Sequence, residues 1–213
     1  MLTIWGRITS INVRKAVWCA QELAVPFERI DVGGAFGGNH TPAYLAMNPN
    51  GSIPTMVDGE GPFEVTLYES NVIVRYLCAR YASGSLYPAG LAARFDAERW
   101  MDWQQTTVNP AGRNAFHQLI RTPVAERDPA KIRESINAME PVLQRLNEHL
   151  ATHAFMQGEH FGMADIPLGC EVHRWWGLPA ADYQRPALPH IERWFAALQA
   201  RPAAKGVLDL KVE

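Results

Sequence analysis

Two segments at predicted helix starts combine residue types that could bind an anion. Glu69 and Ser70 directly precede an apolar helical pattern. The Ser70 hydroxyl can cap that helix, and the free N–H groups of a helix N-terminus also attract an anion, so both roles are open. Ser10 and Asn12 stand in the equivalent place before the first helical pattern. A serine needs an activating base before it can accept a proton, and no His/Asp partner is identifiable. From the residues alone, Ser10 or Asn12 could simply cap the helix, and Ser10 is not expected to act as a base.

Strand and helix patterns alternate in the segment that carries these residues. Apolar runs at 2–5, 26–32, 53–57 and 64–68 predict strands, and apolar stripes at 13–23, 43–47 and 70–81 predict helices. The order strand, helix, strand, helix, strand, strand, helix predicts a mixed sheet with helices packed on its faces.

The pattern changes after the last of these helices. Residues 82–90 are rich in small residues, glycine and proline, and we expect them to form a linker. Strand signals then stop. Helical patterns cover 91–121, 129–151, 164–176 and 189–200, with a kink expected at Pro110. The sequence therefore predicts an α/β domain over 1–81 and an all-helical domain over 91–213.

Charge, hydropathy and cysteine content argue against several classes of protein. Twenty basic and 22 acidic side chains give a net charge of -2 without a block of like charges, which argues against nucleic acid as a partner. We find no apolar run of membrane-spanning length and no signal-peptide pattern at the N-terminus, so we expect a cytoplasmic protein that does not enter membranes. The three cysteines lie far apart, and we expect them to be reduced and buried.

Two further patterns imitate binding motifs. The cluster Gly33–Gly38 follows a strand but lacks the Gly-Lys-Ser/Thr ending of a phosphate loop. His149 and His153, with His160 nearby, have helical metal spacing but lack the glutamate of a zinc motif, so we expect no metal.

One motif makes the sequence specific. Asn50-Gly51-Ser52-Ile53-Pro54 is followed, twelve residues after Pro54, by Thr66-Leu67-Tyr68-Glu69-Ser70. This pattern resembles the glutathione transferase superfamily, whose usual signatures are Asn-Pro-x-Gly-Lys-Val/Ile-Pro and Glu/Gln-Ser. The resemblance covers essentially the whole chain, which is similar to serine-type bacterial members of theta-like or nu-like type. It implies a thioredoxin-like N-terminal domain (βαβαββα, mixed four-stranded sheet), an all-α C-terminal domain, and a homodimer that uses glutathione as co-substrate, without a metal.

The resemblance assigns four residues to the cysteinyl and γ-glutamyl parts of glutathione. Pro54 matches the family's cis proline, and the backbone of Ile53 would pair with the cysteinyl backbone like an added strand. Ser70 would receive the γ-glutamyl carboxylate at its helix N-terminus, and Glu69 would bind the γ-glutamyl ammonium group.

Further contacts with glutathione are implied at the edges of this site. His40 stands where several serine-type members carry a residue near the glycyl carboxylate, although a solvated loop histidine is equally consistent. Ser52 replaces the family's common lysine, which raises the demand on His40. Asp102 and Gln104 would contact glutathione across a dimer interface, as equivalent helices do in the family.

The resemblance also makes Ser10 the hydroxyl that activates the glutathione thiol. Asn12 matches the asparagine of bacterial and fungal members that read Thr or Ser, x, Asn, and Thr9 is adjacent. Neither tyrosine nor cysteine stands there, unlike the tyrosine and cysteine classes. A free thiol has a pKa of about 8.5, and one hydrogen bond worth roughly 1.5–3 kcal/mol would lower that pKa by about one to two units. Asn12 would be a second donor or a positioning residue.

The electrophile should bind between the two domains, beside the first part of the long helix. Candidates spaced so that several could share a face are Trp103, Thr107, Asn109, Arg113 and His117, and Trp175 could close the pocket from a later helix. Aromatic residues at helical spacing are more often part of the core. Arg113 would favour electrophiles with carbonyl, nitro or carboxylate oxygens.

A structural motif of the family is recognisable in weakened form near residue 162. Gly162 and Asp165 resemble the buried N-capping motif Ser/Thr-x-x-Asp, with glycine in place of the hydroxyl residue. We expect Asp165 to be structural rather than catalytic.

Three functions fit this sequence. The first is a transferase that conjugates the glutathione thiolate to hydrophobic electrophiles, an activity associated with detoxification. The second is a glutathione-dependent disulfide-bond reductase or peroxidase, suggested by Ser10-x-Asn12. The third is a non-catalytic binding or regulatory protein that keeps the fold, because fold alone does not assign function.

Overall fold

The N-terminal domain is built on a four-stranded mixed sheet with strand order β2-β1-β3-β4. In the computed structural model, which describes residues 1–179, 183 and 185–213, β1 (Leu2–Trp5) runs parallel to β2 (Phe27–Ile30). It runs antiparallel to β3 (Thr55–Asp58), which pairs antiparallel with β4 (Val65–Tyr68). The predicted thioredoxin-like fold class is confirmed.

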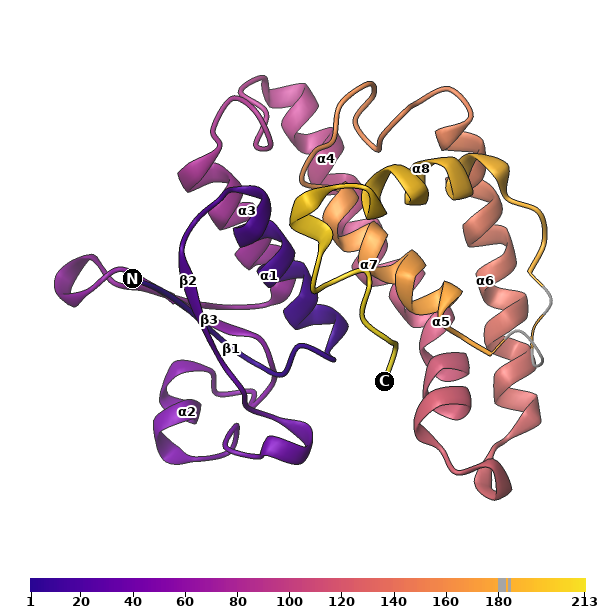
Figure 1. The fold of residues 1–213 in the computed structure, drawn as a ribbon, viewed down its shortest axis with the longest axis horizontal. Helices are drawn as coiled ribbons and strands as arrows, with labels where there is room; N and C mark the ends of the chain where they lie inside the picture. The colour runs from indigo at the N-terminus through magenta and orange to yellow at the C-terminus, as the bar shows by residue number, and fades with distance from the viewer. Residues whose placement is uncertain (180–182, 184) are drawn as a thin grey trace.

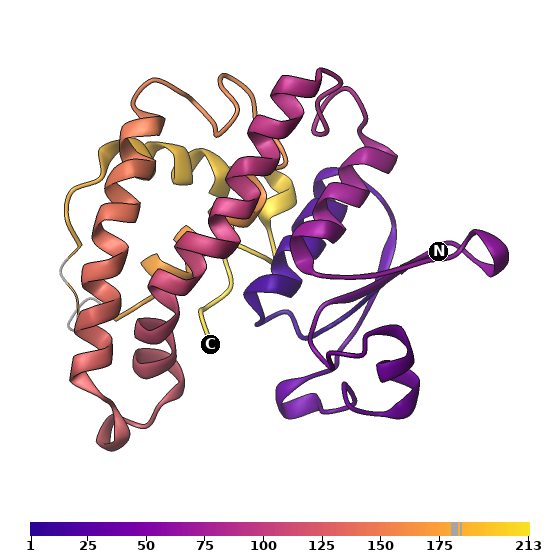
Figure 2. The same cartoon turned by 180° about the vertical axis from the view of Figure 1, so that it is seen from behind.

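Three helices accompany the sheet: α1 (Ile11–Glu22), α2 (Pro42–Met47) and α3 (Ser70–Tyr81). Helices α1 and α3 pack against each other and lie between the sheet and the helical domain (Figure 1). Helix α2 lies away from the helical domain, as Figures 1 and 2 both show. The N-terminal end of α1 therefore faces the second domain, which is where a residue must stand to act on a ligand between the domains.

The predicted strand over 53–57 begins later than expected. Pairing with Trp5 and with Tyr68 starts at Thr55. Pro54 has no N–H to offer a ladder, and the Ile53–Pro54 peptide is cis. Among the described residues, Ile53 makes no backbone hydrogen bond in the sheet, so its N–H and C=O are left for another partner.

The predicted helix over 91–121 is one path interrupted by two wider turns. It runs through α4 (Leu91–Trp103), the π-helical turn η3 (Gln104–Val108), α5 (Asn109–Phe116) and the π-helical turn η4 (His117–Arg121). A proline ring in a regular helix clashes with the carbonyl four residues earlier. The widening just before Pro110, where the Asn109 N–H reaches Gln104 O, relieves that clash in place of a sharp kink.

The remaining helices are α6 (Pro129–Leu150), α7 (Asp165–Trp176) and α8 (Pro189–Gln199), close to their predicted ranges. Short 3₁₀ turns complete the fold at Gly34–Phe36 (η1), Gly61–Phe63 (η2), Val124–Glu126 (η5) and Pro202–Ala204 (η6). Helix α3 ends at Tyr81 and α4 begins at Leu91.

Asp165 occupies the structural position expected for it. Its fully buried carboxylate accepts hydrogen bonds from Gly162 N (2.8 Å), Met156 N (2.9 Å) and Trp194 Nε1 (2.7 Å). Burial raises the pKa of Asp165 to about 6, and these hydrogen bonds oppose the rise. The motif therefore ties the start of α7 to a preceding loop and to α8.

Candidate functional site

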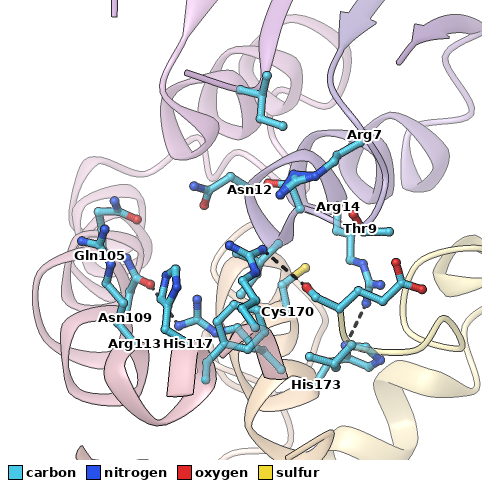
Figure 3. A pocket seen from close by; sticks show the side chains of 18 residues that line it. Arg7, Thr9, Asn12, Arg14, Gln105, Asn109, Arg113, His117, Cys170 and His173 are labelled. Carbon is cyan, nitrogen blue, oxygen red and sulfur yellow. Dashed lines mark hydrogen bonds between the residues drawn. The ribbon is translucent and has the colours of Figure 1, made fainter. Parts of the chain in front are cut away.

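A cleft of about 360 Å³ lies between the start of α1 and the helical domain (Figure 3). Its floor and walls come from α1, the α5–η4 segment, α7 and the C-terminal residues. The lining residues are Arg7, Thr9, Ser10, Ile11, Asn12, Arg14, Ile53, Gln105, Asn109, Arg113, Phe116, His117, Arg121, Cys170, His173, Arg174, Val212 and Glu213. The structure thus brings together the predicted residues Ser10, Asn12, Ile53, Arg113 and His117.

Ser10 occupies the N-cap position of α1, but its side chain makes no capping hydrogen bond. Its main-chain N–H donates to Arg7 O (3.1 Å), and its hydroxyl has no hydrogen-bond partner among the described residues. A capping role would engage the Oγ atom with the first helical turn. The Ser10 hydroxyl is instead uncommitted and lines the cleft, as a donor to a bound anion must be.

Asn12 is held in place by α3 rather than by its own helix. The Ser70 hydroxyl donates to Asn12 Oδ1 at 3.3 Å. This contact occupies the oxygen of the amide, and within the described residues the Nδ2 group makes no hydrogen bond. The amide N–H groups of Asn12 are therefore free to donate within the cleft beside Ser10.

The start of α3 differs in one detail from expectation. Ser70 is the first helical residue, and Glu69, with φ 70°, holds the N-cap position. The predicted cap by the Ser70 hydroxyl is wrong, because that hydroxyl turns toward Asn12. The first N–H groups of α3 consequently keep their capacity for an anion, and Glu69 is exposed next to them.

A buried polar chain continues behind these residues. The Lys15 ammonium group is fully buried and lies 3.5 Å from Ser70 Oγ and 2.9 Å from Gln104 Oε1. Gln104 Nε2 donates to Glu171 Oε1 at 2.7 Å, and Glu171 pairs with Arg174 at 2.7 Å. Burial lowers the pKa of Lys15 to about 8, while the charge of Glu171 opposes that shift.

Gln104 is therefore in the interior of the protomer and does not face a partner subunit. The expectation that Gln104 contacts glutathione across a dimer interface is wrong, because the amide is fully buried and its Oε1 and Nε2 atoms are both engaged. The π-helical turn η3 places Gln104 inward and the neighbouring Gln105 in the cleft. Asp102 remains exposed and pairs with Arg75 of its own chain.

The loop before β3 places His40 beside the Ile53 segment. The His40 ring packs against Gly51, and a Cβ added at Gly51 would lie only 2.6 Å from the ring. Gly51 also has φ 61°, a backbone conformation that favours glycine. Asn39 Nδ2 donates to Gly51 O at 2.6 Å and lies 3.3 Å from His40 Nε2. His40 and Ser52 are both exposed on this loop, so both are accessible to a ligand running along Ile53.

The structure separates the residues predicted for the electrophile. Arg113, His117 and Asn109 line the cleft, whereas Trp103, Thr107 and Trp175 are not among its lining residues. Trp103 packs edge-on against Trp100 at 5.2 Å. Trp175 is buried against Tyr183 and beside Gly112. Trp175 belongs to the core, and Trp103 is partly buried and packs against the core.

Five arginines line the cleft, and only Arg113 was singled out from the sequence. The others are Arg7, Arg14, Arg121 and Arg174. Arg121 stands eight residues after Arg113 with His117 midway, a spacing that could have indicated it. The other three stand outside that spacing, and the contacts of Arg14 with His173 and Lys211 cross from one domain to the other.

Arg14 and His173 connect the C-terminal segment to the cleft. The Arg14 guanidinium is buried and donates to Ile8 O (3.0 Å) and Lys211 O (2.6 Å), and it lies 3.0 Å from His173 Nδ1. Burial and, to a lesser extent, the charge of Arg14 lower the pKa of His173 to about 4. His173 is therefore neutral at physiological pH and acts as an acceptor for Arg14.

The histidines with metal-like spacing and the three cysteines make ordinary structural contacts. His149 and His153 stack at 4.3 Å, and His149 Nε2 lies 3.0 Å from Met156 O. Across the described ranges, no group of three or more His, Cys, Asp or Glu side chains is arranged to hold a metal ion.

The three cysteines are buried and unbonded, as expected, with Cys19 Sγ 3.6 Å from Cys78 Sγ. No helix in the described part of the chain combines the length and hydropathy needed to cross a bilayer.

Comparisons with known proteins identify the family of both domains. Residues 9–80 match the family model of the glutathione S-transferase N-terminal domain, and residues 105–202 match the model of the C-terminal domain. The chain is 38% identical to the glutathione S-transferase GstB of Escherichia coli K12 over 212 residues, covering 100% of both proteins. It is 31% identical to elongation factor 1-gamma 2 of rice, of which the match covers 47% against 94% of this chain.

A solved structure is similar over the full length. The theta class glutathione S-transferase of Xanthomonas axonopodis pv. citri with glutathione bound superposes with a TM-score of 0.92. It is 46% identical, and the match covers 100% of this chain and 99% of that chain.

Proposed function

The chain belongs to the glutathione S-transferase family and is a glutathione transferase, and on this premise we propose that Ser10 stabilises the glutathione thiolate for attack on an electrophile in the cleft. The uncommitted Ser10 hydroxyl at the N-terminus of α1 carries this proposal. A residue that only capped the helix would have its hydroxyl turned back to the first turn.

The chemistry needs the anionic form of the thiol, because the thiolate is the nucleophile. The Ser10 hydroxyl and the free amide of Asn12 would both donate to the sulfur, and the N-terminal end of α1 adds favourable potential. A hydrogen bond to a charged group is worth roughly 1.5–3 kcal/mol, or about one to two units of pKa. The thiol proton passes to water, the sulfur–carbon bond forms, and the leaving group departs with its electron pair.

Glutathione itself would lie along the N-terminal domain. The unpaired backbone of Ile53, next to the cis Pro54, supports pairing with the cysteinyl backbone. The start of α3 at Ser70 and the exposed Glu69 offer one partner for each charge of the γ-glutamyl end. His40 and Ser52 lie at the other end of Ile53, where the glycyl carboxylate would bind.

A Ser10→Ala variant tests the assignment, with Thr9→Ala as the neighbouring hydroxyl for comparison. We expect Ser10→Ala to raise the pKa of the bound thiol by about one to two units and to lower kcat/KM for 1-chloro-2,4-dinitrobenzene about ten- to hundredfold near pH 7. The ultraviolet absorbance of bound thiolate against pH measures the first effect. A larger loss in Thr9→Ala, or full thiolate formation in Ser10→Ala, would show that Ser10 is not the donor.

The same proteins test the other two functions. Faster turnover of a model disulfide or an organic peroxide than of the nitroaryl chloride would favour the reductase or peroxidase. Glutathione binding without turnover of any of these compounds would favour a binding protein, a role that the match to a rice elongation factor makes worth testing.

We also propose that two copies associate and that the protein acts in the cytoplasm. Phe63 (82% exposed) on η2 and Leu91 (66%) and Phe95 (60%) on α4 present large apolar side chains on both domains, which a second copy would cover. Three unbonded cysteines agree with a reducing compartment. Light scattering in solution measures the association directly.

A further inference from the structure

Five arginines line the cleft, and none of them is needed to stabilise the thiolate at Ser10. We propose that the electrophile carries a carboxylate, held by Arg113 and Arg121 on the α5–η4 wall together with Arg7 on the opposite wall. This inference rests on the proposed function, because it names the class of electrophile that the same cleft receives.

Two of the five arginines already have their own partners. Arg174 pairs with Glu171 at 2.7 Å and donates to Asn109 Oδ1 at 3.0 Å. Arg14 is buried and donates to the main-chain oxygens of Ile8 and Lys211 and to His173. These two groups build the cleft and have little capacity left for a ligand.

The other three arginines, Arg7, Arg113 and Arg121, make no ion pair with an acidic side chain of the described chain. Arg121 makes one long contact, 3.4 Å to Glu213 O. Glu213 is the one acidic residue among the described residues that line the cleft, and it is exposed. Unneutralised arginines around one cavity favour an anionic ligand.

Two arginines of the helical wall pack against the same aromatic ring. The guanidinium carbons of Arg121 and Arg174 lie 4.7 Å and 5.2 Å from the centre of the Phe116 ring. Desolvation lowers the pKa of Arg121, and the charges of Arg7 and Arg174 lower it further. Desolvation likewise lowers the pKa of His117, followed by the charges of Arg121, Arg113 and Arg174. An anion bound here would relieve this mutual repulsion.

The glycine-rich segment holds Arg7 on the opposite wall. A Cβ at Gly34 would lie 2.6 Å from Arg7 Nε, and Gly34 has φ 59°, a conformation that glycine adopts readily. The segment that imitates a phosphate loop in the sequence therefore gives room to a cation of the cleft. Arg7 reaches the cleft from the N-terminal domain and Arg113 from the helical domain (Figure 3).

The carboxylates of glutathione do not provide partners for the arginines of the helical wall. In the proposed binding mode its carboxylates lie at the start of α3 and near His40 and Ser52, and none of these residues lines the cleft. Arg113 and Arg121 remain for the second substrate. Guanidinium groups bind carboxylates through paired parallel hydrogen bonds, which would fix the substrate with its electrophilic carbon toward the sulfur at Ser10.

Two matched substrates isolate the carboxylate. In 4-chloro-3-nitrobenzoate and 4-chloro-3-nitrobenzamide the thiolate adds to the carbon that bears chlorine, the sulfur–carbon bond forms, and chloride leaves with the electron pair of the broken bond. The two compounds have nearly the same shape and differ by one charge. Each kcat/KM is divided by the uncatalysed rate constant for the same compound with glutathione, which removes the difference in intrinsic reactivity.

We expect the carboxylate to receive about tenfold more rate enhancement than the amide in the natural protein, as one or two charge-assisted hydrogen bonds would supply. Arg113→Gln and Arg121→Gln should each lower that ratio several-fold, and the double variant should abolish it. Arg133→Gln is the matched control, because Arg133 is exposed on α6 outside the cleft and loses the same charge.

The other outcomes overturn the inference in distinguishable ways. Equal enhancement of both compounds in the natural protein would refute the carboxylate preference while leaving the transferase function standing. A preference that survives the double variant, or that falls equally in Arg133→Gln, would refute the arginine assignment. Turnover of neither compound while 1-chloro-2,4-dinitrobenzene is still conjugated would refute the inference alone. Turnover of none of the three, with glutathione binding intact by calorimetry, would remove the proposed function as well.

Discussion

The ammonium group of Lys15 on α1 lies 2.9 Å from Oε1 of Gln104 on η3, and this contact joins the two domains in the interior. It belongs to a chain of polar contacts from Ser70 through Lys15 and Gln104 to Glu171. Buried polar networks are favourable only when their members are paired, so they fix one arrangement of the elements that carry them. The start of α1, which presents Ser10, is thereby held relative to the helical wall of the cleft.

The burial of Lys15 predicts a pH-dependent stability. Its pKa is about 8 in the folded protein and about 10.5 when unfolded. Between these values the unfolded chain binds more protons, so the Lys15 contribution to the free energy of unfolding rises with pH, by up to about 1.4 kcal/mol per unit. Below about pH 8 both states are protonated and the contribution is constant.

Urea unfolding of the natural protein and Lys15→Met near pH 7.5 and pH 9.5 measures this slope. We expect the natural protein to gain stability relative to Lys15→Met at the higher pH. Lys131→Met removes an exposed lysine from α6 and should show no such change. If the free energy of unfolding changed with pH in the same way in both proteins, the lowered pKa of Lys15 would be contradicted.

At Gly169 on α7 we expect alanine to destabilise the protein, although alanine is normally more favourable than glycine in a helix. Alanine in place of glycine normally stabilises a helix by about 1 kcal/mol. At Gly169 the added Cβ would lie 2.7 Å from Leu198 Cδ1 and 2.9 Å from Trp18 Cζ3, and both side chains are fully buried. We expect Gly169→Ala to lower the free energy of unfolding by about 1–3 kcal/mol through overpacking between α1, α7 and α8.

Gly112 on α5 provides the matched comparison for Gly169. Its added Cβ would meet Trp175 no closer than 3.3 Å, so a small adjustment suffices. Urea denaturation followed by tryptophan fluorescence should show a smaller loss for Gly112→Ala than for Gly169→Ala. A gain of stability in Gly169→Ala would mean that α1 and α7 can separate without cost.

Alanine substitutions at Gly34 and Gly37 distinguish a loss of stability caused by backbone strain from a displacement of Arg7 in the cleft. Both have positive φ, 59° and 60°, so alanine at either position should cost about 1–2 kcal/mol of stability. A Cβ at Gly34 displaces Arg7, whereas a Cβ at Gly37 meets no atom of the described chain within 4 Å. We therefore expect only Gly34→Ala to reduce the preference for 4-chloro-3-nitrobenzoate over 4-chloro-3-nitrobenzamide. An equal change of that preference in both variants would show that Arg7 does not contribute.

Local patterns predicted the elements well because strand alternation and helical stripes are properties of neighbouring residues. They also placed Ser10 and Asn12 at the start of α1, but they included Ile53 in a strand that begins only at Thr55. Trp175, expected to close the cleft from a later helix, is buried against Tyr183 instead. Helical spacing failed for Trp103. The π-helical turn before Pro110 changes the turn angle, so residues on either side of it no longer share the face that regular spacing predicts.

The sequence by itself determined the two-part architecture, the family and the position of Ser10 and Asn12 at the start of the first helix, because each is encoded over short distances along the chain. The tertiary structure decided that the Ser10 hydroxyl is uncommitted, that Gln104 and Lys15 are interior, and that arginines from both domains surround one cleft. Arg7 and Arg121 are 114 positions apart in the chain, and Arg14 contacts Lys211 across 197. Their proximity depends on how the domains pack, and residue spacing does not contain that information.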